Sequence, residues 1–185
     1  MKAIILISEA SLPLAKTLQR ELPDTLIYTK NECEGCISIT SCHRFIEEHF
    51  NDFDSIIFIG AMGICVRSIA GCIKNKYKDP AVVCVDSTGR FVISVLSGHV
   101  GGANELTRHI AAITGGEAVI TTQSDNAGLW ALDTLAGKYG WKITVPHAKM
   151  NRLVTLFVNR EPTALLLDIK AVSYTHLTLP TKRIV

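Results

Sequence analysis

The sequence has little net charge and no long apolar run, and each absence excludes a class of protein. Its 185 residues include 19 Lys and Arg against 17 Asp and Glu, a net charge of +2. A nucleic-acid-binding domain needs basic residues in clear excess or clustered on one face, so we expect no nucleic-acid partner. The longest apolar runs, such as 55–61, are far shorter than the roughly 20 residues that cross a bilayer. No secretory core forms before Ser8 and Glu9, so we expect a cytoplasmic protein with no membrane partner.

Three motifs that bind nucleotides or activate a serine are also absent. The first apolar run ends at residues 8–11 without a glycine, where the dinucleotide fingerprint G-x-G-x-x-G would begin. Neither a G-x-x-x-x-G-K-[ST] phosphate loop nor a G-x-S-x-G nucleophile elbow occurs in the chain. The sequence therefore predicts neither a standard nucleotide-binding loop nor a serine hydrolase of the elbow type.

The six cysteines do not follow a pattern typical of secreted, disulfide-rich domains. Because no signal peptide precedes them, we expect free thiols rather than a disulfide framework. Cys33, Cys36 and Cys42 lie close enough in sequence to share a metal ion, whereas the other three sit among apolar neighbours and should be buried. A structural zinc site normally needs a second close pair of ligands, and none follows, so we favour ordinary cysteines over a metal site.

Apolar runs alternate with segments of helical spacing along the first 125 residues. Charged residues make up only 19% of the chain and the mean hydropathy is +0.26, which indicates a folded domain with a large core. We expect buried strands over 2–7, 25–28, 55–59, 81–85, 91–96 and 117–121, and helices over 11–21, 37–50, 62–73 and 100–114. Residues 86–89 have the composition and length of a hairpin turn. This order predicts an α/β fold, a three-layer Rossmann-like domain with a mainly parallel sheet.

Three parts follow one another along the chain in this interpretation. Residues 1–125 form the N-terminal α/β domain, and residues 126–171 form a truncated central domain, an incomplete α/β unit too small to be stable alone. Within the second part we expect helices over 129–139 and 149–158 and strands over 141–145 and 163–167. Residues 172–185 continue neither periodicity and resemble translated adaptor sequence, so we treat them as an artefact-like tail. Without that tail the charges balance, since Lys182 and Arg183 account for the net +2.

The strongest local signal is the glycine-rich segment 97–105, SGHVGGANE, between a predicted strand and a predicted helix. Its glycines let the backbone turn sharply, and the helix start offers N–H groups to an anion or a developing oxyanion. His99 is suited to act as a general acid or base near neutral pH, with Asn104 and Glu105 close by in the first helical turn. The alternative is a glycine-rich turn in which His99 only bonds a neighbouring loop, and the sequence leaves both interpretations open.

Two further strand ends carry candidate ligand-binding residues. The turn 60–63 is followed by Arg67, which is able to pair with a carboxylate or simply to face solvent. Thr121 and Thr122 begin a run of five hydrogen-bonding side chains that ends at Asp125. Such a run is typical of a ligand site at a strand end or of a helix N-terminal cap.

Four segments, 63–70, 78–83, 92–106 and 119–122, carry a pattern that is more specific in combination than any one of them. In this order and spacing they resemble the N-terminal domain of the cobalt-precorrin-5A hydrolase (CbiG-type) family of anaerobic cobalamin biosynthesis. Residues 126–168 are similar to the start of that family's central domain. The resemblance implies a hydrolase that opens the δ-lactone of cobalt-precorrin-5A and releases acetaldehyde, giving cobalt-precorrin-5B. The partner would be a cobalt tetrapyrrole, and no cofactor is implied because the substrate carries the cobalt.

Set against that reaction, the candidate residues take individual roles. His99 or Glu105 would be the base that activates water, and the N–H groups of Gly101, Gly102 and Ala103 would hold the oxyanion. The other expected substrate contacts are Arg67, Gly98, Asn104, Thr121 and Thr122. Two other functions stay open, namely non-catalytic corrinoid binding and phosphate or nucleotide binding at the same helix start. The oligomeric state is not predicted.

Overall fold

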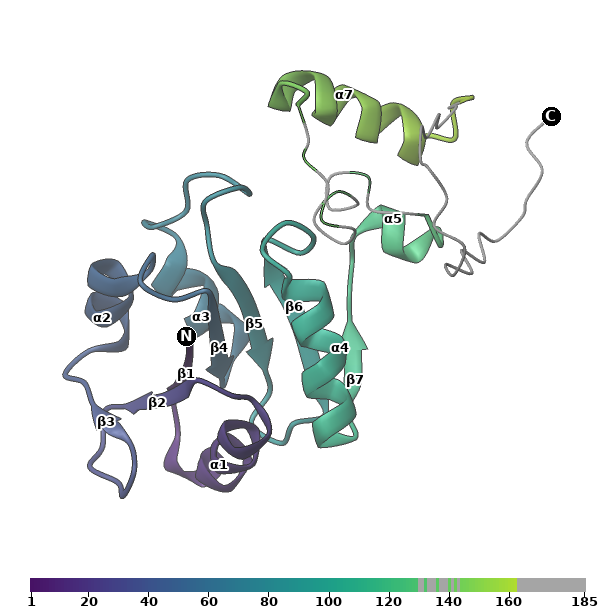
Figure 1. Cartoon of the computed structure of the whole chain (residues 1–185). Helices are drawn as coiled ribbons and strands as arrows, with labels where there is room; N and C mark the ends of the chain where they lie inside the picture. The colour runs from purple at the N-terminus through teal and green to yellow at the C-terminus, as the bar shows by residue number, and fades with distance from the viewer. Residues whose placement is uncertain (130–131, 133–135, 137–139, 141, 143, 163–185) are drawn as a thin grey trace.

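A seven-stranded mixed sheet organises the first 120 residues of the chain in a computed structural model, which describes residues 1–129, 132, 136, 140, 142 and 144–162 (Figure 1). The strand order is β3-β2-β1-β4-β5-β6-β7. The strands are β1 (Lys2–Leu6), β2 (Thr25–Thr29), β3 (Ile37–Ser38), β4 (Ser55–Ile59), β5 (Ala81–Val85), β6 (Phe91–Leu96) and β7 (Glu117–Val119). The predicted α/β fold with a mainly parallel sheet is confirmed.

The one reversal of direction in this sheet lies between β5 and β6. Strands β1 to β5 all run parallel, β6 pairs antiparallel with β5, and β7 runs parallel to β6. Asp86 closes the connecting turn, because its carboxylate accepts the backbone N–H groups of Thr88 at 3.0 Å and Phe91 at 2.7 Å. The hairpin predicted for residues 86–89 is therefore confirmed. As a result, β6 and β7 end at the end of the sheet where the parallel strands β1 to β5 begin.

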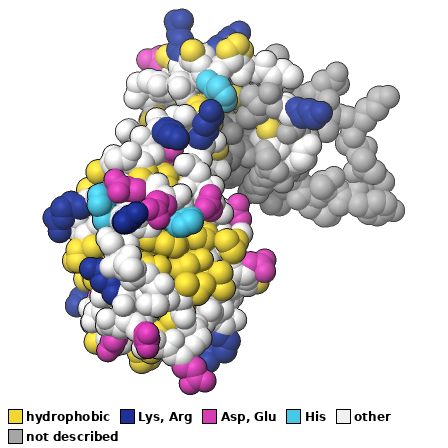
Figure 2. All heavy atoms as spheres, turned by 90° about the vertical axis from the view of Figure 1, so that its left-hand side faces the viewer, with side chains coloured by type: hydrophobic (Ala, Val, Ile, Leu, Met, Phe, Trp, Pro, Cys, Tyr) yellow, Lys and Arg dark blue, Asp and Glu magenta, His cyan; other side chains and the backbone are white. Residues whose placement is uncertain are grey.

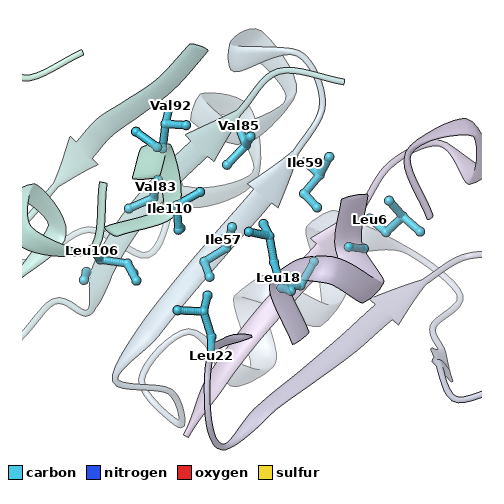
Figure 3. Close-up of a cluster of buried hydrophobic side chains, with 14 of the residues drawn as sticks. Leu6, Leu18, Leu22, Ile57, Ile59, Val83, Val85, Val92, Leu106 and Ile110 are labelled. Atoms are coloured by element: carbon cyan, nitrogen blue, oxygen red, sulfur yellow. The ribbon is translucent and has the colours of Figure 1, made fainter. Parts of the chain in front are cut away.

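Helices cover both faces of the sheet and produce three layers. The helices are α1 (Leu12–Glu21), α2 (Cys42–His49), α3 (Met62–Ile69), α4 (Ala103–Thr114), α5 (Gln123–Asn126) and α7 (His147–Val158), with a 3-10 turn at Glu9–Ser11. Leu18 of α1 and Ile110 of α4 pack on one face against Ile57 (Figure 3). Ile46 of α2 packs on the other face beside Phe58. Consecutive residues of β4 thus point into opposite cores, which explains its unbroken apolar sequence.

Several predicted helices begin or end elsewhere than expected, and the helix predicted over 62–73 already ends at Ile69 as α3. Residues 37–50 were expected to form one helix, but Ile37–Ser38 pairs with β2 as an edge strand and the helix begins only at Cys42. Ser41 sets that start, because its side chain accepts the N–H of Arg44 as an N-terminal cap. Helix α4 begins at Ala103 rather than at residue 100, because residues 97–102 form a tight loop.

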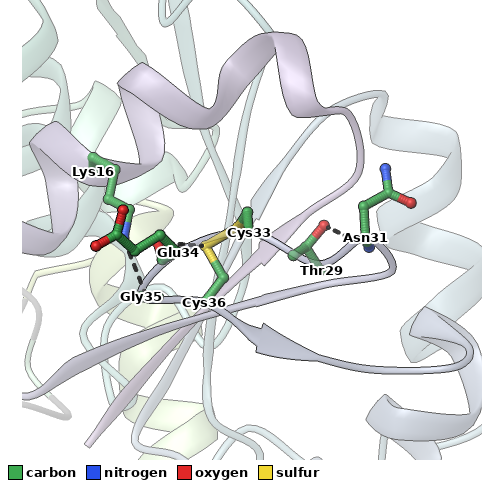
Figure 4. The surroundings of a disulfide bond; sticks show 7 residues. All are labelled: Lys16, Thr29, Asn31, Cys33, Glu34, Gly35 and Cys36. Carbon is green, nitrogen blue, oxygen red and sulfur yellow. Dashed lines mark hydrogen bonds between the residues drawn. A yellow bond between two sulfur atoms is a disulfide. The ribbon is translucent and has the colours of Figure 1, made fainter.

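The expectation of free thiols is wrong for two cysteines. Cys33 and Cys36 form a disulfide in the loop before β3, where Lys16 donates to the carbonyl of Gly35 at 3.1 Å (Figure 4). Cys42 is buried in α2 instead, with its sulfur 3.9 Å from the Ser68 hydroxyl, so the three cysteines do not share one site. Among the residues that the structure describes, no group of three or more His, Cys, Asp or Glu side chains is placed to hold a metal ion.

An apolar patch lies on the side of the molecule that carries β3 and α2, bordered by charged side chains (Figure 2). At this end of the sheet Leu26 of β2 and Ile37 of β3 are both partly exposed. Tyr28, Phe45 and Phe53 form an aromatic cluster beside them, with ring centroids 4.5 to 6.1 Å apart. Because β3 pairs with only two residues of β2, the rest of β2 is an open edge.

The part of the chain after β7 contributes α5 and α7. Helix α7 confirms the helix predicted over 149–158, and it begins two residues earlier, after Pro146. The predicted elements at 129–139 and 163–167, and the tail 172–185, lie wholly or largely outside the described residues. The strand predicted over 141–145 is not found at its three described residues, 142, 144 and 145. No helix within the described ranges is both long and apolar enough to cross a membrane.

Candidate active site

The glycine-rich segment 97–102 and the polar run 121–125 meet at one end of the sheet, where β6 and β7 end. Leu96, the last residue of β6, pairs with Val82 near the start of β5, and β7 runs beside β6 in the same direction. Residues 97–102 and 121–125 therefore both lie at this end of the strands. The two segments are far apart in sequence, and the reversed hairpin brings them together.

His99 and Asp125 form the closest contact between the two segments. The His99 Nε2 lies 2.6 Å from the Asp125 Oδ2 and 3.3 Å from the Ser124 hydroxyl. The His99 side chain is 18% exposed and that of Asp125 is 17% exposed, so a substrate can reach the ring while most of the pair is shielded from water. The structure thus shows the loop bond that one interpretation of His99 expected, and the partner is a carboxylate.

Asp125 accepts hydrogen bonds from three further side chains. Its Oδ2 accepts from Asn104 Nδ2 and from the Thr122 hydroxyl, both at 2.9 Å. Its Oδ1 accepts from the Arg108 guanidinium. Asn104 is itself buried, and its amide also donates to the Thr122 hydroxyl at 2.7 Å while accepting from Ser94 at 2.7 Å. One carboxylate therefore ties α4 and the His99 loop to the segment after β7.

The ionisation of Asp125 decides which nitrogen of His99 carries a proton. Burial raises the pKa of Asp125, but hydrogen bonds from His99, Arg108 and Thr122 outweigh burial and lower it to about 2. At neutral pH the carboxylate is ionised and can only accept, so the His99 Nε2 must donate to it. In the neutral ring the lone pair is then on Nδ1, which is the atom able to take a proton.

The loop that carries His99 is closed by close packing and by its own backbone bonds. A side chain at Gly101 would place its Cβ 2.5 Å from the Ser97 Cβ and 2.9 Å from the Ser97 carbonyl oxygen. Gly102 has φ +84°, a left-handed conformation that favours glycine. The N–H of Gly102 donates to the His99 carbonyl at 3.1 Å, and that of Ala103 donates to the Ser97 carbonyl at 3.2 Å. An oxyanion would have to displace these carbonyls to use the two N–H groups.

The other predicted site residues differ in how closely they are packed around His99 and Asp125. Glu105 is exposed in the first turn of α4, and Thr121 is exposed beside Thr122. Gly98 packs so close to Asn104 that an added Cβ would lie 2.7 Å from the Asn104 Oδ1. Gly98, Asn104 and Thr122 are thus assembled around the pair, with Glu105 and Thr121 at its margin.

Arg67 is not brought into this cluster. It follows the turn after β4, and β4 ends at the opposite end of the sheet from β6 and β7 because it runs in the opposite direction. Its guanidinium lies back over Gly63, where an added Cβ would sit 3.4 Å from Nη1. Any carboxylate bound by Arg67 would therefore be held at the other end of the domain.

Four contributing residues were not singled out from the sequence. They all bond within the network described above: Ser94, Arg108, Ser124 and Asp125. Asp125 closes the polar run that had been noticed, so its position was available as a signal. Arg108 and Ser94 have no local signal, because only the packing of α4 against β6 and α5 brings them to the site.

Two family models match consecutive parts of the chain. The model described as "Cobalamin synthesis G N-terminal" matches residues 44–125, and "Cobalamin biosynthesis central region" matches residues 130–184. The chain belongs to the CbiG family. The first match contains every residue of the His99–Asp125 network, and the second extends across residues 172–184.

Curated relatives of this CbiG-family chain carry the name cobalt-precorrin-5A hydrolase. The protein from Salmonella typhimurium is 43% identical over 136 residues, which is 72% of this chain and 39% of the relative. The protein from Priestia megaterium is 37% identical over 147 residues, which is 75% of this chain and 39% of the relative. The chain thus spans about two fifths of the length of these relatives.

The CbiG fold is also seen in a solved structure. A crystal structure of a cobalamin biosynthesis protein G homologue from Sulfolobus solfataricus aligns with a TM-score of 0.53 and 22% identity. The alignment covers 93% of this chain and 51% of that one. At this identity the likeness supports the fold.

We predict that Gly101→Ala destabilises the protein by about 1–3 kcal/mol, because the new methyl group meets the backbone and Cβ of Ser97. Gly71→Ala is the matched control, since nothing lies within 4 Å of a Cβ at that position. Urea unfolding of the two variants measures the difference. Equal stability of the two variants would show that the loop is not closed by this contact.

We also predict that part of the stability depends on ionised Asp125. The folded-state pKa lies below the ordinary 3.8, so this stabilisation is complete above about pH 4 and is lost as the pH falls toward 2. The difference in unfolding free energy between the wild type and Asp125→Asn should shrink by about 1–2 kcal/mol between pH 6 and pH 2. Urea titrations at several pH values measure it.

Gln123→Ala is the control for this pH series. Gln123 is exposed in the same short helix and does not titrate, so its difference from the wild type should stay constant with pH. A constant difference for Asp125→Asn as well would contradict the proposed ionic network.

Proposed function

We propose that this chain carries the cobalt-precorrin-5A hydrolase site of its family, with His99 as general base and Asp125 as the residue that positions it. The observation that carries the proposal is the 2.6 Å contact between His99 Nε2 and an ionised carboxylate. Identities of 43% and 37% to two hydrolases over most of the chain support it. A cobalt tetrapyrrole as substrate and a cytoplasmic place of action belong to the same proposal.

The first chemical step is the hydrolysis of the δ-lactone. Water adds to the lactone carbonyl while the Nδ1 of His99 takes one of its protons, and the Asp125 carboxylate stabilises the resulting imidazolium. The tetrahedral oxyanion then collapses, the carbon–oxygen bond of the ester breaks, and the leaving alkoxide receives the proton from His99. The products of this step are a carboxylate and an alcohol.

The second step releases acetaldehyde. The alcohol loses its proton and becomes a carbonyl as the carbon–carbon bond to the macrocycle breaks. The electron pair of that bond passes to the ring carbon, which is then protonated. One water is consumed overall, and no oxidant or reductant is needed. His99 serves both steps, because a ring that has given up its proton in the first is again a base for the second.

Basic side chains at the same end of the sheet as His99 suit a substrate with many carboxylates. Lys74, Lys76 and Lys78 are exposed in the loop that leads into β5. Asp79 in this loop is fixed next to the site, since its backbone carbonyl accepts from Ser97 at 2.9 Å. These lysines are better placed than Arg67 to meet the carboxylates of a substrate bound at His99. Glu105, exposed one turn away, is the second candidate base.

The test is acetaldehyde release from cobalt-precorrin-5A by two proteins. One is the 185-residue chain, and the other is this chain joined to the remaining part of the Salmonella typhimurium relative. Release by either form supports the proposal, and release only by the longer form means that the rest of the protein completes the site. If neither form releases acetaldehyde while the intact relative does, the proposal fails and a corrinoid-binding role without catalysis takes its place.

We predict that His99→Ala lowers the rate of acetaldehyde release by roughly 10²–10⁴-fold in the active form, because a general base typically contributes that much. His109→Ala is the matched control, since His109 is exposed on α4 and does not belong to the network around Asp125. The control should keep the wild-type rate within about twofold. A normal rate for His99→Ala would transfer the role of base to Glu105 or to another group.

A further inference from the structure

A cleft lies beside the His99 loop and joins the first domain to α7. Its volume is about 470 Å³, within the roughly 300–1,000 Å³ of small-molecule sites. The lining residues are Tyr77, Val100, Thr144, Val145, Pro146, His147 and Met150. They come from the loop before β5, from the His99 loop, and from the first turn of α7 with the three residues that precede it, so none of these segments forms the cleft alone.

The cleft is next to the candidate base. Val100 follows His99 directly in the chain, lines the cleft and is 38% exposed. A molecule in contact with the Val100 side chain therefore touches the residue that follows His99 in the chain. Val145, Pro146 and Met150 add further apolar side chains to the lining. Such a surface favours an apolar part of a ligand over its charged groups.

Two rings form one wall of the cleft. Tyr77 and His147 lie with ring centroids 4.1 Å apart and planes tilted by 36°. The Tyr77 hydroxyl donates to the Asn151 side chain at 3.0 Å, which holds its ring against α7. A fixed pair of rings is suited to a flat, conjugated ligand, because stacked planar groups attract each other beyond the area they bury.

The rim of the cleft is basic. Tyr77 stands between Lys76 and Lys78, with Lys74 in the same loop, and all three lysines are exposed. The Lys76 ammonium lies 5.0 Å from the centroid of the Tyr77 ring. On the α7 side Lys149 is exposed next to Met150. A ligand that is apolar and flat at its centre and carries carboxylates at its periphery matches this arrangement.

We infer that the cleft binds one edge of the cobalt tetrapyrrole, with the ring against Tyr77 and His147 and the peripheral carboxylates toward the lysines of the rim. The inference rests on the proposed function, because it names how that substrate is held at the His99 site. It assigns substrate binding to the start of α7, outside the segment that carries His99 and Asp125. Substrate binding then depends on α7 as well as on the domain that carries His99 and Asp125.

The test is a titration of the 185-residue chain with cobyrinic acid, a cobalt corrinoid with free carboxylates, followed by its visible absorbance. Met150→Trp fills the cleft and should weaken binding by roughly tenfold or more. Leu156→Trp is the matched control, since Leu156 is 39% exposed on the same helix and outside the cleft. It should change the affinity by less than about twofold.

A second variant guards against a folding defect. His147→Ala removes one exposed ring from the wall without adding bulk, and it too should weaken binding while the thermal unfolding midpoint stays near that of the wild type. The inference is overturned if the chain binds no corrinoid. It is also overturned if folded Met150→Trp and His147→Ala both bind like the wild type.

Failure of the inference and failure of the proposed function give different results. In the longer, active form Met150→Trp should raise KM for cobalt-precorrin-5A far more than it lowers kcat. Acetaldehyde release with an unchanged KM overturns the inference and leaves the hydrolase proposal intact. Corrinoid binding that Met150→Trp weakens, in a protein that releases no acetaldehyde in either form, overturns the hydrolase proposal and supports the cleft.

Discussion

The carboxylate of Asp125 holds together segments that the sheet alone would leave side by side. It accepts bonds from the His99 loop, from two side chains of α4 and from Thr122 on its own segment. These donors keep it ionised, and an ionised carboxylate in turn fixes the orientation and tautomer of His99. The chemistry proposed for the site therefore depends on this contact as well as on His99 itself.

The sheet was predictable because its strands carry their own signal. β1, β4 and β5 are buried on both faces, so each reads as a short, unbroken apolar run. The helix starts were less predictable. Residues 37–38 are as apolar as the helix that follows, and only the cap at Ser41 and the pairing with β2 separate them. The disulfide of Cys33 with Cys36 was missed because these cysteines were expected to remain free thiols.

The site was predicted in part, and the missing part depends on tertiary structure. His99 and Asn104 stand out because glycines surround them at a strand end. The role of Asp125 requires a contact across 26 positions, which no local periodicity encodes. Arg67 was grouped with His99 because both follow a strand and a glycine turn. The hairpin predicted at 86–89 already implied the opposite direction for the next strand. The turn before Arg67 and the loop with His99 were therefore bound to lie at opposite ends of the sheet.

That hairpin has a consequence for how the domain can change. Since a five-residue strand is about 17 Å long, the turn after β4 and the loop after β6 are separated by roughly the length of a strand. No residue of the 60–63 turn belongs to the hydrogen-bond network of His99 that the structure describes. Sequence changes at one end therefore need not disturb the other, so related proteins can carry different surfaces at the 60–63 turn around the same His99 network.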